Sequence, residues 1–210
     1  MKTKDFIDFL ATGAGPAPAP NTTKKLRTAL LTGLIASLGI GLLVNGVVIT
    51  PSAFAGRWFK VAYAMSVLTA GWILVKQLSR PISRVSKPLW GLVLAVLVMF
   101  GFGATDLLSV SVEQYDALFF GQSWLMCSLL ILLFSLPALA AALWTMRTLA
   151  PTRLRLAGFS AGIFAGAQGA LGYFLICPED SFLFVAVWYT LGMVLSGLLG
   201  MLLGPRVLQW

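Results

Sequence analysis

Long runs of apolar residues recur along most of the chain, and polar segments separate them. A helix rises about 1.5 Å per residue, so roughly 20 apolar residues cross a hydrocarbon layer about 30 Å thick. Each run is long enough, or nearly so, for one crossing. The pattern therefore predicts an all-α polytopic membrane protein, a bundle of about six transmembrane helices over residues 28–50, 58–75, 88–104, 124–146, 156–177 and 182–203.

The charged residues fall mainly in the segments between the apolar runs, and their distribution predicts an orientation. Lys and Arg near helix ends tend to remain in the cytoplasm. With the N-terminus inside, every basic residue except Arg57 and Lys60 lies on the inner side. We therefore expect both termini in the cytoplasm. The net charge of +8 follows from this topology, so we expect no direct contact with nucleic acid.

The first 27 residues differ from the rest of the chain. Within the segment MKTKDFIDFLAT, Phe6, Phe9 and Leu10 recur at a spacing that places them on one face of a helix. A Pro- and Ala-rich stretch follows, and prolines favour extended backbone. The predicted organisation is a cytoplasmic amphipathic segment (1–12), a linker with a basic juxtamembrane stretch (13–27) and a six-helix transmembrane domain (28–210).

The composition argues against an enzyme. The chain has no histidine, which excludes histidine-based acid–base catalysis and histidine metal ligands. Gly158 to Gly162 match a Gly-x-Ser-x-Gly pattern, but a serine hydrolase also needs a strand-to-helix turn and a base that activates the hydroxyl. Small residues at every fourth position, here Gly158, Gly162 and Gly166, instead indicate close packing between helices.

A small membrane transporter or channel is the main alternative class. Ionisable side chains at membrane depth are costly and are usually kept for function. None lies in the middle of an apolar run, and this absence argues against a polar path through the bundle. The glycine-rich helix faces leave a homo-oligomer open as a further possibility.

Cys127 and Cys177 are the two cysteines of the chain, and the predicted topology places both near the outer face. Two such thiols can form a disulfide in an oxidising compartment if their Cα atoms approach within about 4.4–6.8 Å. They can also share a soft metal ion. Glu179 and Asp180 follow Cys177 closely and are candidate neighbours of such a sensing pair. On residue chemistry alone, two buried small apolar side chains are an equally good interpretation.

Several local strings are similar to one known family. They are MKTKDFIDFLA at the N-terminus, GQSWLMC at 121–127, LAPTR at 149–153 and, above all, CPEDSFLFVAVWY at 177–189. Together they resemble the NrsF family, negative regulators of sigma F, which are anti-sigma factors of the bacterial inner membrane with six helices. The resemblance runs nearly from end to end of the chain.

The resemblance implies a non-enzymatic, multi-pass protein of the bacterial cell inner membrane that sequesters an extracytoplasmic-function sigma factor. It also implies release of that sigma factor when stress, such as heavy metal or oxidation, is detected at the periplasmic face. In this chain the expected sensing pair is Cys127 and Cys177. No cofactor is expected apart from a soft metal ion that would act as the signal.

The N-terminal segment suits the binding of a soluble partner. An amphipathic helix on a Pro-rich tether can dock its apolar face in a groove of that partner. Phe6, Ile7, Phe9 and Leu10 are then the residues expected to contact the sigma factor. Binding of the same helix to the surface of the membrane lipid is the other interpretation of this segment.

Overall fold

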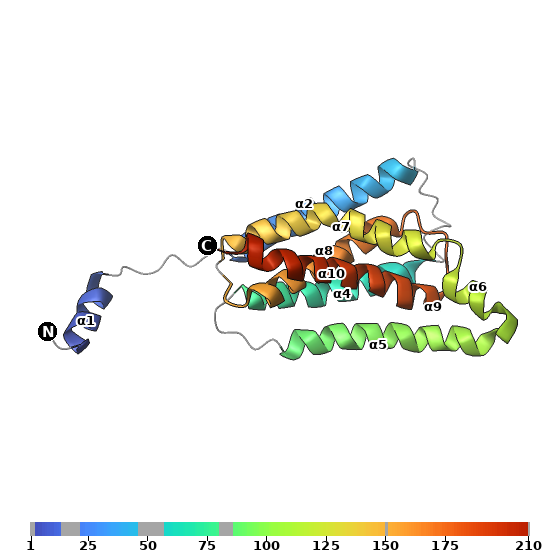
Figure 1. The fold of residues 1–210 in the computed structure, drawn as a ribbon, viewed down its shortest axis with the longest axis horizontal. Coiled ribbons are helices and arrows are strands. Elements are labelled where there is room, and N and C mark those ends of the chain that lie inside the picture. The colour runs from blue at the N-terminus through green and yellow to red at the C-terminus, as the bar shows by residue number, and fades with distance from the viewer. Residues whose placement is uncertain (1–2, 14–21, 46–56, 80–85, 150, 210) are drawn as a thin grey trace.

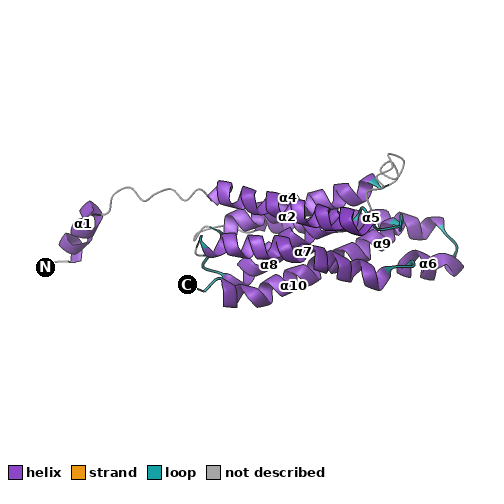
Figure 2. Cartoon of the chain, turned by 90° about the horizontal axis from the view of Figure 1, so that it is seen from above, coloured by secondary structure: helices purple, strands orange, loops and turns teal. Residues whose placement is uncertain are grey.

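The computed structural model describes residues 3–13, 22–45, 57–79, 86–149 and 151–209, and all regular elements within these ranges are helical. Long helices run side by side along one common axis (Figures 1 and 2). Five helical segments are long and apolar enough to cross a membrane, which confirms the all-α polytopic class. The long helices are α2 (Thr22–Asn45), α4 (Trp58–Leu78), α5 (Ser86–Ser109), α7 (Trp124–Arg147), α8 (Leu154–Tyr173) and α10 (Thr190–Val207).

Short elements lie at the N-terminus and at one end of the bundle. The last membrane helix begins with α9 (Phe182–Phe184) and a π-helical segment (Val185–Tyr189) before it continues as α10. π-Helical turns often occur at functional sites. The other short elements are α1 (Thr3–Gly13), a 3₁₀ turn (Val112–Gln114) and α6 (Tyr115–Phe120).

Helix α8 is the centre of the bundle, because α10, α7, α4 and α2 all pack against it. Its small residues allow this close approach. A Cβ atom built on Gly162 would lie 2.2 Å from the Ser196 carbonyl oxygen, and one built on Gly158 would lie 2.1 Å from the Gly200 carbonyl oxygen. The packing predicted for these glycines is therefore confirmed, and the neighbouring helix belongs to the same chain.

The helix boundaries differ from the sequence predictions at several places. Helix α5 reaches Ser109, five residues beyond the expected end, and α8 ends at Tyr173 rather than at Cys177. Cys177 precedes Pro178, and the residue before a proline disfavours helical backbone. Helix α2 begins at Thr22, so the basic juxtamembrane stretch is helical. Residues 14–21 and 46–50, parts of the predicted linker and of the first predicted span, lie outside the described residues.

The two ends of the bundle carry opposite kinds of charge. Helix α2 begins and α10 ends at the same end of the bundle (Figure 1). The helix ends there bear basic residues, and we call this end of the bundle the basic end. The opposite end, where α6 and α9 lie, bears the acidic residues and is called the acidic end. This separation is the one that the predicted topology requires, although the cytoplasmic side itself stays a prediction. The acidic end carries Asp106, Glu113, Asp116, Glu179 and Asp180 together with Arg57 and Lys60.

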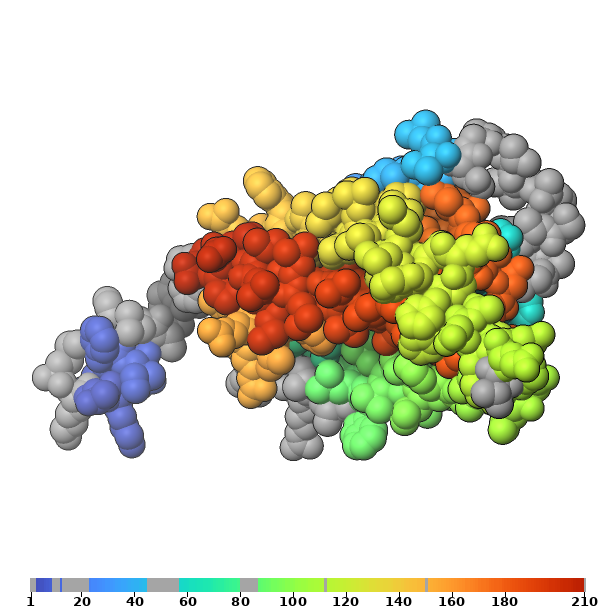
Figure 3. Space-filling view, turned by 45° about the vertical axis from the view of Figure 1, so that its right-hand side comes forward, coloured from blue at the N-terminus to red at the C-terminus, as the bar shows by residue number. Residues whose placement is uncertain are grey.

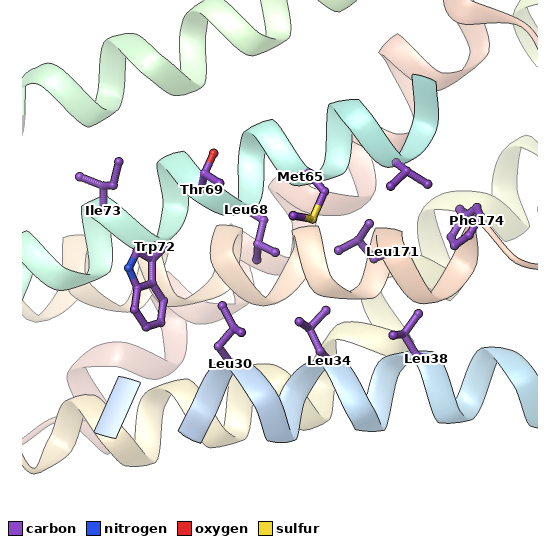
Figure 4. Close-up of a pocket in the computed structure, with 11 residues that line it drawn as sticks. Leu30, Leu34, Leu38, Met65, Leu68, Thr69, Trp72, Ile73, Leu171 and Phe174 are labelled. Carbon is purple, nitrogen blue, oxygen red and sulfur yellow. The ribbon is translucent and has the colours of Figure 1, made fainter. Parts of the chain in front are cut away.

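An apolar groove of about 740 Å³ lies between α2 and α4, with α8 at its floor (Figure 4). Leu30, Leu34 and Leu38 of α2 face Met65 and Trp72 of α4 across it. Nearly all of its lining side chains are apolar, so the groove offers little to a polar substrate. It lies within the membrane-spanning part of the bundle.

Candidate functional site

The two cysteines meet at the acidic end of the bundle. Cys127 lies at the first turn of α7, and Cys177 lies in the loop of residues 174–181 between α8 and α9. Both are free thiols with no exposed surface. The two thiols lie close enough to influence each other's ionisation, and the Cys177 thiol donates a hydrogen bond to the Glu179 carbonyl oxygen at 4.0 Å. The structure therefore brings the two predicted sensing residues together, but it buries both thiols instead of exposing them to the outer solution.

Charge and hydrogen bonds around Cys177 favour its thiolate. Cys177 follows α8 and lies outside the helical spans. The hydrogen bond from Cys127, helped by the positive charge of Lys60, lowers the pKa of Cys177 to about 6 even though burial acts in the opposite direction. A thiolate is the reactive form of cysteine toward oxidants and metals. Of the pair, Cys177 is therefore the cysteine whose surroundings favour the thiolate.

Two buried tyrosines complete the surroundings of the thiols. The rings of Tyr173 and Tyr189 lie 5.8 Å apart between their centroids. The Tyr189 side chain is fully buried beside Cys177, and its hydroxyl lacks a well-formed hydrogen bond among the described residues. Buried polar groups are usually satisfied, and the Cys177 sulfur is the group with which the Tyr189 hydroxyl interacts.

The two acidic neighbours predicted from the sequence anchor the Cys177 loop to other elements. The Glu179 carboxylate accepts a 2.7 Å hydrogen bond from the Gln122 backbone N–H, at the turn before α7. Gly121 in that turn has φ of +53°, a conformation that favours glycine. Asp180 pairs with Arg57 at 3.2 Å and with Lys60 at 3.4 Å.

These contacts limit how the site could hold a metal ion. The described residues contain no group of three or more His, Cys, Asp or Glu side chains that could bind one. A soft ion at this site would therefore depend on the sulfurs of Cys127 and Cys177. Thiolate ligands select soft metals, so the pair still fits that class of ion.

Sequence reasoning missed Asp106 of α5 as part of this region. Its carboxylate oxygen Oδ2 accepts hydrogen bonds from the backbone N–H groups of Phe182 at 2.7 Å and Leu183 at 3.3 Å, and from the Ser181 hydroxyl at 3.2 Å. Ser181 in turn accepts a hydrogen bond from the Phe184 N–H. A serine before an apolar run indicates a helix cap. No local signal connects that cap with an aspartate 75 residues away.

Lys60 is the second residue that sequence reasoning missed. It lies in the first turn of α4 and is fully buried. Its Nζ is 3.4 Å from the Cys177 carbonyl oxygen and 3.4 Å from the Asp180 carboxylate. Its signal in the sequence is its position as one of two basic residues on the side of the bundle where acidic residues predominate.

An aromatic cluster covers the acidic end beside the cysteines. Phe119 and Phe120 of α6 pack around Trp188 of the π-helical segment, and Trp124 of α7 lies 5.0 Å from Trp188 between ring centroids. The Trp188 indole N–H donates a 2.7 Å hydrogen bond to the Phe119 carbonyl. Figure 3 brings this end forward and shows the α6 region lying across it. The cluster ties α6 to the helix that follows Cys177.

The predicted partner-binding segment forms α1, which lies apart from the bundle (Figure 1). Phe6 is 48% exposed and Ile7 is 57% exposed, so both apolar side chains are available for contact. The backbone at Phe9 and Leu10 is helical. The placement of their side chains lies outside what the structure describes. The role of these four residues stays a prediction.

Comparison with known proteins gives one consistent family. Residues 10–210 match the family described as "Negative regulator of sigma F". The chain is 38% identical over 216 residues to the "Probable anti-sigma-F factor NrsF" of Azospira oryzae. It is 36% identical over 222 residues to the "Anti-sigma-F factor NrsF" of Caulobacter vibrioides.

Both of these alignments cover the whole of this chain and the whole of the relative. No solved structure matches the chain. The resemblance inferred from the local strings is confirmed, and the family's regulatory, non-enzymatic character agrees with the composition. This chain belongs to the family of negative regulators of sigma F.

Proposed function

We propose that this protein is a membrane-bound anti-sigma factor that holds an extracytoplasmic-function sigma factor and releases it under heavy-metal or redox stress. The observation that carries the proposal is the match to two anti-sigma-F factors over the full length of the chain. The protein resides in the bacterial inner membrane, with both termini and the basic end in the cytoplasm. The acidic end then faces the periplasm.

The N-terminal helix supplies the main contact with the sigma factor. Phe6 and Ile7 are exposed on a helix that stands apart from the bundle. Burying a large apolar side chain contributes about 1.5–3 kcal/mol, so three or four such residues provide a large share of the binding energy. Phe9 and Leu10 extend the same sequence pattern. The exposed basic residues at the nearby helix ends add attraction to an acidic partner.

The paired thiols receive the signal at the periplasmic face. On oxidation, the sulfurs of Cys127 and Cys177 form one bond, and two protons and two electrons pass to an oxidant of the peroxide class. A soft metal ion instead displaces the thiol protons and binds both sulfurs. Either event changes the loop that follows α8, to which α4, α5 and the turn before α7 are all anchored.

Co-purification tests the partner. The full-length chain, solubilised from membranes that also contain candidate sigma factors, is expected to retain one of them. A chain that lacks residues 1–12 is expected to insert in the membrane and to lose the sigma factor. The matched control carries Lys4→Gln, which changes a polar position on the same helix and should retain the partner. Equal retention by the deleted chain would assign binding to the loops at the basic end.

Substitution of the cysteines tests the sensor. Cys127→Ser and Cys177→Ser are each expected to hold the sigma factor without stress and to lose its stress-induced release. The control is Ser128→Ala, at the next position of α7, which removes a hydroxyl that donates to the Trp188 carbonyl but leaves both thiols. Normal release by both cysteine variants would contradict the proposed sensor.

A further inference from the structure

Lys60 combines full burial with a direct contact to the thiol site. Its side chain has no exposed surface, whereas its partner Asp180 is 57% exposed. A buried ammonium group loses its hydration, and a single ion pair compensates for this loss only when the geometry is good. Lys60 Nζ lies 3.4 Å from Asp180 Oδ1, and because Asp180 is more than half exposed, the ion pair alone compensates for only part of this loss.

The second contact of Lys60 is to the backbone of Cys177. Its Nζ lies 3.4 Å from the Cys177 carbonyl oxygen. The Cys177 N–H donates to the Tyr173 carbonyl at 3.1 Å. Both backbone groups of Cys177 are therefore held, one by α8 and the other by α4. Together they fix the position from which the Cys177 side chain meets Cys127.

The other anchors of the loop act farther along the chain. Glu179 binds the turn before α7, and Asp106 binds the N–H groups at the start of α9. Arg57 contacts the Asp180 carboxylate at 3.2 Å. Among these side-chain anchors, Lys60 is the one that contacts Cys177 itself.

We propose that Lys60 is a positioning residue of the thiol site, which holds the Cys177 backbone so that its sulfur faces the Cys127 thiol. The proposal deepens the proposed function, because it assigns a residue that sets how readily the two thiols react with each other. Disulfide geometry is narrow, so a small displacement of one cysteine slows the joining of the two sulfurs strongly. Lys60 has neither sulfur among its described contacts; it acts on Cys177 through the backbone carbonyl, and its positive charge also favours the thiolate.

The test measures cross-linking of the two cysteines in the purified full-length chain without any sigma factor. Copper(II) phenanthroline takes two electrons from the thiols and passes them to dioxygen, while two protons are released and the sulfur–sulfur bond forms. The rate is followed by the loss of free thiols and by the mass of the linked peptide. Because no sigma factor is present, the result does not depend on whether this chain binds one.

Lys60→Met removes the ammonium group and keeps a long apolar stem. It is expected to slow cross-linking by roughly tenfold to a hundredfold, since a misplacement of about 1 Å can cost that much in rate. In a Cys127→Ser background, and at a pH where the Cys177 thiol is fully ionised in both chains, the same change should make Cys177 react faster with a small alkylating reagent, because the loop is released. Lys60→Arg keeps a cation in place and should restore cross-linking. A general loss of packing would not be rescued in this way.

Arg57→Gln is the matched control, because Arg57 shares Asp180 with Lys60 and has no contact with Cys177 among its described interactions. It should cross-link at the rate of the unchanged chain. If Lys60→Met fails to accumulate in membranes, Lys60→Gln replaces it, since its side chain is shorter and uncharged. An unchanged rate in the Lys60 variants, or an equal decrease in Arg57→Gln, would overturn the proposal.

Discussion

The acidic and basic ends of the bundle are built differently. At the acidic end, Asp106, Glu179 and Asp180 each make specific contacts, and both ion pairs formed by the described residues lie there. At the basic end the Lys and Arg side chains are largely exposed. Lys25 of α2 donates a hydrogen bond to the Thr148 hydroxyl, at the end of α7. One end therefore has a fixed internal network, while the other presents charge outward. The difference suits a protein that receives a signal at one end and meets a partner at the other.

Helix α8 runs between these two ends, so disrupting its packing should destabilise both ends at once. Gly162→Leu places a side chain where a Cβ atom alone would lie 2.2 Å from the Ser196 carbonyl oxygen. We expect a loss of several kcal/mol of stability, because backbone on both sides must move. Thermal unfolding in detergent measures the loss. Gly101→Leu is the control, since a Cβ atom at Gly101 meets nothing within 4 Å.

Changing the predicted partner-binding segment, α1, should affect sigma-factor binding alone. The double substitution Phe6→Asp and Phe9→Asp is expected to weaken sigma-factor binding by about 3 kcal/mol or more, because two large apolar side chains lose their burial. Binding is measured by titration of the purified chain. Bundle stability and thiol cross-linking should stay unchanged. Retained binding would show that charge at the basic end, rather than the apolar face of α1, provides the affinity.

Removing the cap on the last membrane helix should affect the acidic end alone. Asp106→Ala leaves the N–H groups of Phe182 and Leu183 without their acceptor. A loss of about 1–3 kcal/mol in stability is expected, the usual cost of unpaired buried donors. Hydrogen exchange should increase first at residues 181–184. Glu113→Ala, at an exposed acidic position of the same end, should show neither change.

The smallest expected effect is at Glu179. Glu179→Gln keeps an oxygen that can accept from the Gln122 N–H but removes its charge. The expected loss is about 0.5–1 kcal/mol, because a charge-assisted hydrogen bond becomes a neutral one. Differential scanning calorimetry measures this loss of stability. The control is Asp116→Gln, a change at an exposed acid on α6. A loss as large as that of Asp106→Ala would place the main anchor of the loop at the turn before α7 instead.

The sequence alone determined where the long helices form and how charge is separated between the two ends of the bundle. In hydrocarbon, each span must satisfy its own backbone hydrogen bonds, so an apolar run of sufficient length forms a helix whatever its neighbours are. Chain direction alternates with each span, which places Cys127 and Cys177 at one end. The glycine spacing of α8 likewise predicted a close helix contact, since only small residues permit it.

Only the tertiary structure decided which residues complete the thiol site. Lys60 is 117 residues from Cys177 in the chain, and Asp106 is 76 residues from Phe182. Their contacts depend on which helices are neighbours and how each is rotated, and apolar periodicity does not specify either of these. Glu179 and Asp180 were visible as acids near a cysteine, but their partners were not. A hydrogen bond requires a few tenths of an ångström of precision, and only the packed bundle fixes positions that closely.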